Sequence, residues 1–140
     1  YISSGVQEGA TLITGGKSNT GKGYFVKPTI FTNTSSQMKV VREEIFGPVV
    51  TIMPFKKWDH LITQANDSNY GLAAGIWTQD ISKAHRLSRA LKAGTTWINC
   101  YNIFDAALPF GGYKESGWGR EMGREVLDLY TQTKSSVVRL

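Results

Sequence analysis

The segment LAAGIWTQDISKAHRLSRALKAGTTWIN, residues 72–99, has the clearest pattern of secondary structure in the sequence. Its two ends, residues 72–77 and 95–99, read as short strands. Between them Asp80 can cap a helix that Gly94 ends, and the apolar residues of that helix recur at three- and four-residue steps. These apolar positions are Ile81, Ala84, Leu87 and Leu91. The order strand–helix–strand predicts an α/β fold with a parallel βαβ unit, a right-handed crossover and flanking helices.

Toward the N-terminus the alternation of helix and strand continues, with Gly9 ending the first helix. The predicted elements are the last turns of a helix over 1–8, a strand over 11–14, an exposed loop over 15–23, strands over 24–26 and 29–31 split by Pro28, a strand over 49–55, a helix over 58–66 and a turn over 69–71.

Toward the C-terminus the pattern becomes irregular. Residues 100–119 have no clear period and contain LPFGGYKESGWG, and a loop this long inside a domain is usually functional. A helix is predicted over 120–130, with Met122, Val126, Leu129 and Tyr130 on one face. The chain closes with KSSVVRL, which predicts a terminal strand over 135–140 whose unpaired edge needs a partner.

Composition bounds the class of protein. The chain has 140 residues, 41% hydrophobic and 19% charged, which suits one soluble globular domain. No run of about 18 apolar residues predicts a membrane span, and the first residues lack the basic patch and apolar core of a signal peptide. The chain begins at Tyr1 without an initiator Met, so we expect further sequence upstream.

The formal net charge of +5 raises the possibility of a nucleic-acid partner. The densest basic set lies three residues apart on the helix expected before Gly94 and consists of Lys83, Arg86, Arg89 and Lys92. No RRM, KH or zinc-finger signature accompanies it. A solvated helix face is therefore favoured, and no nucleic-acid partner is predicted.

Cys100 is the only cysteine, so an intrachain disulfide is impossible and a reducing, cytoplasmic location fits. A lone cysteine could be a nucleophile, although a free cysteine is more often a small buried hydrophobe. His60 and His85 lie far apart without a second ligand at useful spacing, so no metal site is predicted. There is also no GxSxG motif for a serine nucleophile.

Two motifs carry the candidate chemistry. The first is EEIFGP, residues 43–48. An ionised carboxylate only accepts hydrogen bonds, which suits the hydroxyl groups of a nucleotide ribose, and Phe46 could lie against a flat ring. Alternatively, Glu43 and Glu44 are surface acids before a strand and Phe46 belongs to the core. Residue chemistry alone favours this alternative.

The second motif is CYNIFDAALPFGGYKESGWGRE, residues 100–121. Tyr101, Phe104 and Phe110 could line an apolar pocket, or they could form a small hydrophobic cluster under a long loop. Its glycines permit close backbone approach but match neither GxGxxG nor a P-loop, so no phosphate cradle is predicted.

Together the ordered motifs REEIFGPVV, NDSNYGLAAGIWTQD, AGTTWINCYN and PFGGYKESGWGRE closely resemble the C-terminal part of the NAD(P)-dependent aldehyde dehydrogenase superfamily, over residues 1–140. The resemblance implies that residues 1–131 are part of the catalytic domain and that 132–140 form an oligomerisation strand in a dimer or tetramer. It also implies NAD, with NADP possible, and a small-molecule aldehyde as substrate.

By the same resemblance, Glu44 binds the ribose next to nicotinamide and Phe46 packs near the nicotinamide ring. The matching positions of the aldehyde pocket are Cys100, Asn102, Phe104 and Phe110. Glu121 resembles a residue that in some relatives supports a hydrogen-bonded path to the general base. The segment FDAALPFGG weakly resembles relatives that handle aromatic or arylacetaldehyde substrates.

The resemblance also implies what these residues lack. The family's nucleophilic Cys, general-base Glu and oxyanion-stabilising Asn all precede this segment, and the NCY context of Cys100 does not match the nucleophile's motif. The implied reaction is oxidation of an aldehyde to a carboxylic acid through a thioester, and we expect the 140-residue chain alone to be inactive. The alternative is a non-catalytic binding or assembly module derived from this domain.

Overall fold

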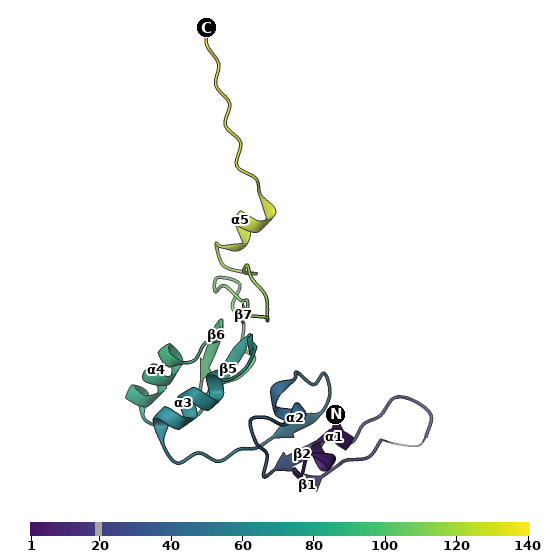
Figure 1. Ribbon diagram of the computed structural model, residues 1–140. Coiled ribbons are helices and arrows are strands. Elements are labelled where there is room, and N and C mark those ends of the chain that lie inside the picture. The colour runs from purple at the N-terminus through teal and green to yellow at the C-terminus, as the bar shows by residue number, and fades with distance from the viewer. Residues whose placement is uncertain (19–20) are drawn as a thin grey trace. The chain divides into compact units, whose positions relative to one another are not determined.

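The computed structural model describes residues 1–18 and 21–140, and it divides into unit 1 (Tyr1–Asp67) and unit 2 (Ser68–Leu140) (Figure 1). Residues 19 and 20 of the predicted loop over 15–23 lie outside the described residues. Within the described part, every helix is too short or too polar to traverse a lipid bilayer.

Unit 1 is built around a small mixed sheet. Its elements are α1 (Ile2–Gln7), β1 (Thr11–Thr14), β2 (Thr29–Thr32), α2 (Lys39–Arg42), β3 (Val49–Thr51) and α3 (Trp58–Asn66). The strand order is β1-β2-β3. β1 and β2 are antiparallel, with Leu12 opposite Phe31, whereas β2 and β3 are parallel, with Phe31 opposite Thr51.

The core of unit 1 centres on Phe31, which is fully buried in the middle strand. A Cβ added to Gly5 of α1 would lie 3.0 Å from the Phe31 ring and 3.1 Å from Val40 of α2, so glycine lets α1 approach both side chains. The buried Thr29 hydroxyl donates to the Lys27 carbonyl at 2.8 Å and accepts from the Gly16 amide at 3.0 Å. Its polar group is therefore satisfied.

The end of α1 confirms the stop predicted at Gly9. Gly9 has φ +93, and its amide donates to the Val6 carbonyl at 3.1 Å. The next amide, of Ala10, donates to the Gly5 carbonyl at 2.9 Å. These two bonds and the left-handed glycine form a Schellman motif.

Unit 2 contains the predicted strand–helix–strand segment. Its elements are β4 (Tyr70–Gly71), β5 (Ala73–Ile76), α4 (Ile81–Ala90), β6 (Thr95–Ile98), β7 (Tyr113–Lys114) and α5 (Val126–Tyr130). β5 and β6 pair in parallel, with Gly75 opposite Trp97, and α4 connects them. β4 and β7 form a separate antiparallel pair.

Helix α4 has the predicted cap. The Asp80 carboxylate accepts from the Lys83 amide at 3.0 Å. Ala84 and Leu87 are buried, as the periodicity predicts, but Ile81 in the first turn is exposed. Of the basic row, Arg86, Arg89 and Lys92 are exposed and Lys83 is half-buried, as a solvated helix face requires.

The α/β class is confirmed, but the sheets are mixed rather than purely parallel. β1 and β2 form an antiparallel pair beside the parallel pair of β2 and β3. The strand predicted over 49–55 stops at Thr51, ahead of Pro54, which has no N–H to donate to a strand ladder. Of residues 24–26, Val26 forms only an isolated bridge.

Two other predictions are wrong in detail, and one helix was not predicted. The turn predicted over 69–71 contains β4, which pairs with β7 across the long irregular segment. The helix predicted over 120–130 begins only at Val126, because Met122 and Gly123 have φ +60 and +59, outside the right-handed helical region. Helix α2 has no counterpart among the predicted elements.

The C-terminal residues 131–140 contain no helix or strand in this single chain, and all ten are exposed. Figure 1 shows them as a trace that follows α5. A strand over 135–140 would need a partner edge, and no described residue pairs with this segment. The assignment of 132–140 to an oligomerisation strand stays a prediction.

Candidate functional site

The EEIFGP motif forms a tight turn between α2 and β3. The Gly47 amide donates to the Ile45 carbonyl at 2.9 Å, and the Val49 amide donates to the Gly47 carbonyl at 2.8 Å. Each bond spans two residues, as in γ-turns. The Pro48 carbonyl then accepts from the Thr29 amide at 2.8 Å, which ties the end of the turn to β2.

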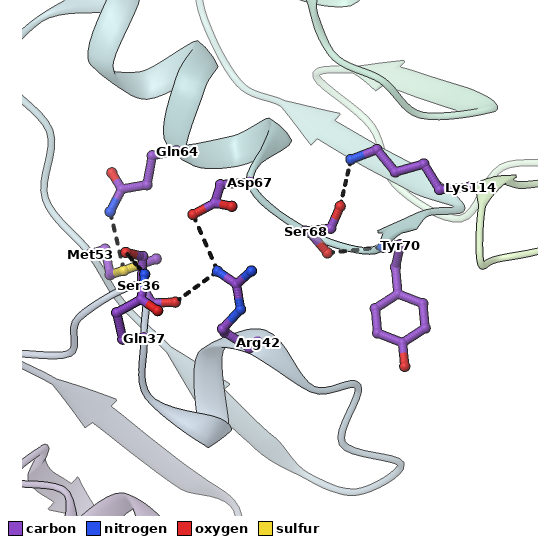
Figure 2. Close-up of polar contacts among 9 residues, drawn as sticks. All are labelled: Ser36, Gln37, Arg42, Met53, Gln64, Asp67, Ser68, Tyr70 and Lys114. Atoms are coloured by element: carbon purple, nitrogen blue, oxygen red, sulfur yellow. Dashed lines mark hydrogen bonds and ion pairs between the residues drawn. The ribbon is translucent and has the colours of Figure 1, made fainter.

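The start of this turn is held by Arg42. Its Nη1 donates to the Ser36 carbonyl at 3.3 Å and to Asp67 Oδ2 at 3.2 Å (Figure 2). A second link in unit 1 runs from Gln64 Nε2 to Met53 Sδ at 3.3 Å. These two hydrogen bonds therefore fix the position of Arg42, which directly precedes the two adjacent acids.

The two acids differ in their surroundings. Glu43 Oε2 accepts from the Tyr1 hydroxyl at 2.6 Å and lies 4.0 Å from Lys39 Nζ. Glu44 is exposed, and its carboxylate has no hydrogen-bond or ion-pair partner among the described residues. Glu43 thus has a structural role, whereas all acceptor sites of Glu44 are open to a ligand.

Phe46 lies in the same turn as Glu44. It is 93% exposed and packs against nothing in unit 1 that would bury it. The interpretation of Phe46 as a core residue is therefore wrong for this chain. One tight turn presents an open carboxylate and an open aromatic face, a combination that suits the hydroxyls and the flat ring of a nucleoside.

The aromatic segment of unit 2 begins where β6 ends. Asn99 has φ +54, and its side chain forms two 2.9 Å bonds with Thr78, accepting from the amide and donating to the carbonyl. This clamp joins the residues that follow β5 and β6. Asparagine tolerates the left-handed region better than most residues, so it suits the position where the chain turns away.

Beyond Asn99, aromatic rings form a connected series. Trp97 lies 5.1 Å from Tyr101 and 5.7 Å from Phe104, both edge-on, and Phe104 lies 5.1 Å from Phe110. Two predicted pocket residues, Phe104 and Phe110, are therefore in direct contact. Such edge-to-face pairs add stability beyond the burial of area.

The other two predicted pocket residues are less tightly held. Cys100 is a half-buried free thiol, and Asn102 is exposed with φ +56. Neither side chain makes a hydrogen bond to another described residue. Both lie in the same segment as Phe104, so the chain places them near the aromatic series without fixing their side chains.

Glu121 is joined to the aromatic series through its backbone. The amides and carbonyls of Phe110 and Glu121 exchange two bonds of 2.7 Å each. Arg120 Nη1 donates to the Gly112 carbonyl at 3.0 Å and to the Gly119 carbonyl at 2.6 Å. Arg120 thereby holds Gly112 and Gly119, at the two ends of the glycine-rich segment, beside the backbone bridge between Phe110 and Glu121.

An open pocket of about 480 Å³ lies next to this bridge. Its lining combines apolar side chains, glycine backbone and one charge of each sign, from Arg120 and Glu121. The lining residues are Leu72, Phe110, Gly111, Gly112, Ser116, Trp118, Gly119, Arg120, Glu121, Leu129 and Tyr130. Two hydrogen bonds to Ser68 order the nearby β4–β7 pair (Figure 2). Lys114 Nζ donates to the Ser68 carbonyl at 2.6 Å, and the Tyr70 amide donates to Ser68 Oγ at 3.1 Å.

Glu44 and Phe46 belong to unit 1, whereas the pocket candidates and Glu121 belong to unit 2. The site predicted from the sequence did not include the residues that hold these groups. They are Tyr1, Arg42, Trp97, Asn99 and Arg120. A tryptophan and an asparagine around the end of a predicted strand were the available signals for two of them. No group of three or more His, Cys, Asp or Glu able to hold a metal occurs among the described residues.

Comparison with known proteins decides the family. The model of the aldehyde dehydrogenase family matches residues 1–136. The chain belongs to the aldehyde dehydrogenase family. It is 53% identical to the mitochondrial benzaldehyde dehydrogenase of Antirrhinum majus, with 100% of the chain covering 26% of that protein.

Solved aldehyde dehydrogenases agree in structure as well as in sequence. An NAD+ complex of the Bacillus cereus aldehyde dehydrogenase has a TM-score of 0.91 and 56% identity, over 94% of this chain and 27% of that one. The P. syringae indole-3-acetaldehyde dehydrogenase with NAD+ and IAA has a TM-score of 0.93 and 44% identity, over 100% and 29%. The chain thus spans little more than a quarter of the length of these aldehyde dehydrogenases.

Proposed function

We propose that these 140 residues work as part of a longer NAD-dependent aldehyde dehydrogenase, which oxidises an aldehyde to a carboxylic acid through a thioester on a cysteine outside this segment. The observation that supports this proposal most directly is the turn that presents Glu44 and Phe46, in a chain that matches the family over residues 1–136. NAD would accept the hydride from the substrate. NADP stays the alternative from the sequence.

In this proposal unit 1 binds and orients the cofactor. The Glu44 carboxylate accepts hydrogen bonds from the ribose next to nicotinamide, and the exposed Phe46 ring lies near the nicotinamide. Their fit rests on the open acceptor sites of Glu44 and the open face of Phe46. The γ-turn over residues 45–47 fixes the backbone at Phe46 before the cofactor binds, which lowers the entropy cost of ordering this part of the site.

Unit 2 supplies part of the aldehyde pocket. Phe104 and Phe110 provide the apolar wall, Cys100 and Asn102 lie along the same segment, and Glu121 supports a proton path toward a general base elsewhere in the longer chain. The contact between Phe104 and Phe110, and the backbone bridge from Phe110 to Glu121, support these assignments. Small-molecule aldehydes are the proposed substrate class.

The parent protein is proposed to be a homo-oligomer, dimer or tetramer, with residues 132–140 as a subunit contact. The exposure of the whole C-terminal segment supports this assignment. The cytoplasmic location stays a prediction from the sequence, and the Antirrhinum majus relative is a mitochondrial protein by name.

The neighbouring acids allow a matched test of the cofactor contact. In the full-length enzyme, Glu44→Gln retains shape and an acceptor but loses the charge. A hydrogen bond to a charged group contributes roughly 1.5–3 kcal/mol, so we expect a loss of about tenfold to a hundredfold in the cofactor-dependent rate. Steady-state and single-turnover kinetics with varied NAD separate hydride transfer from cofactor release.

Glu43→Gln is the control, because Glu43 accepts from Tyr1 and has no proposed cofactor role. We expect its NAD kinetics to stay within about twofold of the parent, with at most a small loss of stability. Equal effects of the two substitutions, or unchanged hydride transfer and cofactor release for Glu44→Gln, would remove Glu44 from the cofactor site.

A further inference from the structure

Trp97 closes the loop that follows β6. Its side chain is buried, with 8% of its surface exposed, and its indole Nε1 donates to the Ile103 carbonyl at 2.8 Å. A buried indole N–H needs an acceptor, and here the acceptor belongs to the backbone six residues further along the chain. Residues 99–103 therefore leave β6 and return to the side chain of Trp97, which belongs to the same strand.

The ring of Trp97 makes two further contacts with the same loop. Tyr101 packs at 5.1 Å with an interplanar angle of 63°, and Phe104 packs at 5.7 Å with an angle of 88°. One side chain thus contacts the loop at three residues, Tyr101, Ile103 and Phe104.

The loop depends on this contact because it buries little surface of its own. Tyr101 and Ile103 are each 64% exposed, and Phe104 is 46% exposed. The Asn99 clamp to Thr78 fixes only the start of the loop. The Phe104 ring lies between those of Trp97 and Phe110, so Trp97 holds the side of Phe104 that Phe110 does not contact.

We propose that Trp97 is a positioning residue that determines substrate preference, by holding the loop over 99–104 in the shape that accepts an aldehyde with an aromatic ring. This inference rests on the proposed function, which places Asn102 and Phe104 in the aldehyde pocket. An aromatic aldehyde contacts the loop over a large area, whereas acetaldehyde has almost no side chain to contact it. Displacement of the loop therefore affects the larger substrate far more.

The test is Trp97→Phe in the full-length enzyme. Phenylalanine retains an aromatic ring against Tyr101 and Phe104 but removes the donor to the Ile103 carbonyl. We expect kcat/KM for phenylacetaldehyde to fall about tenfold, mainly through KM, and kcat/KM for acetaldehyde to change less than about twofold. A loss of general stability alone would not separate the two substrates.

Trp77→Phe is the matched control. Trp77 is also next to Tyr101, at 6.4 Å, but it is 65% exposed and its indole has no hydrogen-bond partner among the described residues. Its substitution is expected to leave the ratio of the two kcat/KM values unchanged. Amide hydrogen exchange in residues 99–105 should rise in Trp97→Phe and not in Trp77→Phe.

A second variant covers the case in which Trp97→Phe does not fold. Tyr101→Leu removes one edge contact of Trp97 and leaves the side chains of Phe104 and Phe110 unchanged, and we expect it to reduce the preference for phenylacetaldehyde in the same direction. An unchanged ratio of kcat/KM values in every folded variant overturns the positioning role and leaves the proposed function intact. Failure of both variants to fold assigns Trp97 to the core alone and also overturns it. A parent enzyme that oxidises neither aldehyde refutes the proposed function, and this inference with it.

Discussion

At the scale of single residues, Glu43 and Glu44 are chemically identical neighbours with different environments. The partner of Glu43 is the hydroxyl of Tyr1, which lies 42 residues away in the sequence. Only the folded chain shows this partner, so residue chemistry could not decide which acid stays open. The resemblance to the family assigned the ligand role to Glu44, and the absence of a partner for that carboxylate among the described residues is compatible with the assignment.

Phe46 illustrates the same limit of sequence reading. An aromatic residue before an apolar strand suggested a core position, yet the ring is almost fully exposed. The two γ-turn bonds around Gly47 direct the chain so that the next residues, and not Phe46, enter the sheet. Hydrophobicity alone predicts burial only on average, because much of a protein surface is apolar.

Asp80 is a residue whose predicted role is confirmed, and it gives a pH-dependent prediction. The hydrogen bond from the Lys83 amide lowers the pKa of the Asp80 carboxyl below its ordinary value, and the Lys83 charge adds to this. Since the folded pKa lies below the unfolded one, the stabilisation is present above the unfolded pKa of about 3.9 and is lost as pH falls through the folded pKa.

We therefore expect Asp80→Ala to lower the urea midpoint of the full-length protein at pH 7, with a smaller difference from the parent below about pH 4. Asp80→Asn is the control, because it keeps a cap acceptor without the charge, and it should lose less than Asp80→Ala at pH 7. A gap between parent and Asp80→Ala that grows on acidification would contradict the assigned direction.

At the scale of elements, the βαβ stretch depends on a close approach at Gly94. Its amide donates to the Gly71 carbonyl at 3.0 Å, and an added Cβ would overlap the Gly111 carbonyl oxygen. The glycine therefore lets the start of β6 lie against the glycine-rich segment that carries Phe110. The Gly111 carbonyl belongs to the backbone, so it cannot move aside as a flexible side chain could.

We expect Gly94→Ala to destabilise the full-length protein by about 3 kcal/mol, at the upper end of the usual cost of overpacking. Gly21→Ala is the control, since an added Cβ there meets nothing within 4 Å and the residue has no positive φ. The free energy of unfolding from urea titration measures both. A Gly94→Ala variant as stable as Gly21→Ala would show that the close approach is not required.

The elements that the sequence predicted well have local signals. Helix α3 has the predicted bounds, Trp58–Asn66, and Asp80 and Gly9 mark helix ends as their chemistry suggests. The elements that were wrong depend on distant partners or on special backbone angles. β4 exists because β7 pairs with it from more than 40 residues away, and α5 is shortened by the left-handed pair Met122 and Gly123.

The candidate site shows the same division. Phe104 and Phe110, which are six residues apart in the sequence, are in contact, as either an aldehyde pocket or a small hydrophobic cluster requires, and their assignment to the pocket stays a prediction. The contacts that hold them, from Trp97 to Ile103 and from Arg120 to the glycine carbonyls, join side chains to backbone oxygens. Every residue carries such an oxygen, so a sequence pattern does not reveal which one is used.

At the scale of the whole molecule, the C-terminal segment gives a prediction about assembly. Val137 is 94% exposed and Val138 is 80% exposed, and neighbouring residues of a strand point to opposite faces. A strand here would leave apolar side chains and unpaired backbone groups open unless another chain covered them. We expect removal of residues 135–140 from the full-length enzyme to reduce its oligomeric state.

Mass in solution, from light scattering, checks this prediction across a range of protein concentrations. Val137→Ser combined with Val138→Ser is a milder variant that retains the backbone and is expected to shift the same equilibrium less. A truncated enzyme that keeps the oligomeric state and stability of its parent would show that the segment is not an assembly element.

In the proposed function, these 140 residues contact the cofactor and the aldehyde, and the chemical steps belong to the rest of a longer protein. The chain spans little more than a quarter of its relatives, and its one cysteine has no hydrogen-bonded base among the described residues. The most direct measurement is NADH formation from acetaldehyde and phenylacetaldehyde by the purified 140-residue chain and by the full-length protein. We predict turnover by the full-length protein and none by the 140-residue chain, whereas turnover by the 140-residue chain that Cys100→Ala abolishes would contradict the account.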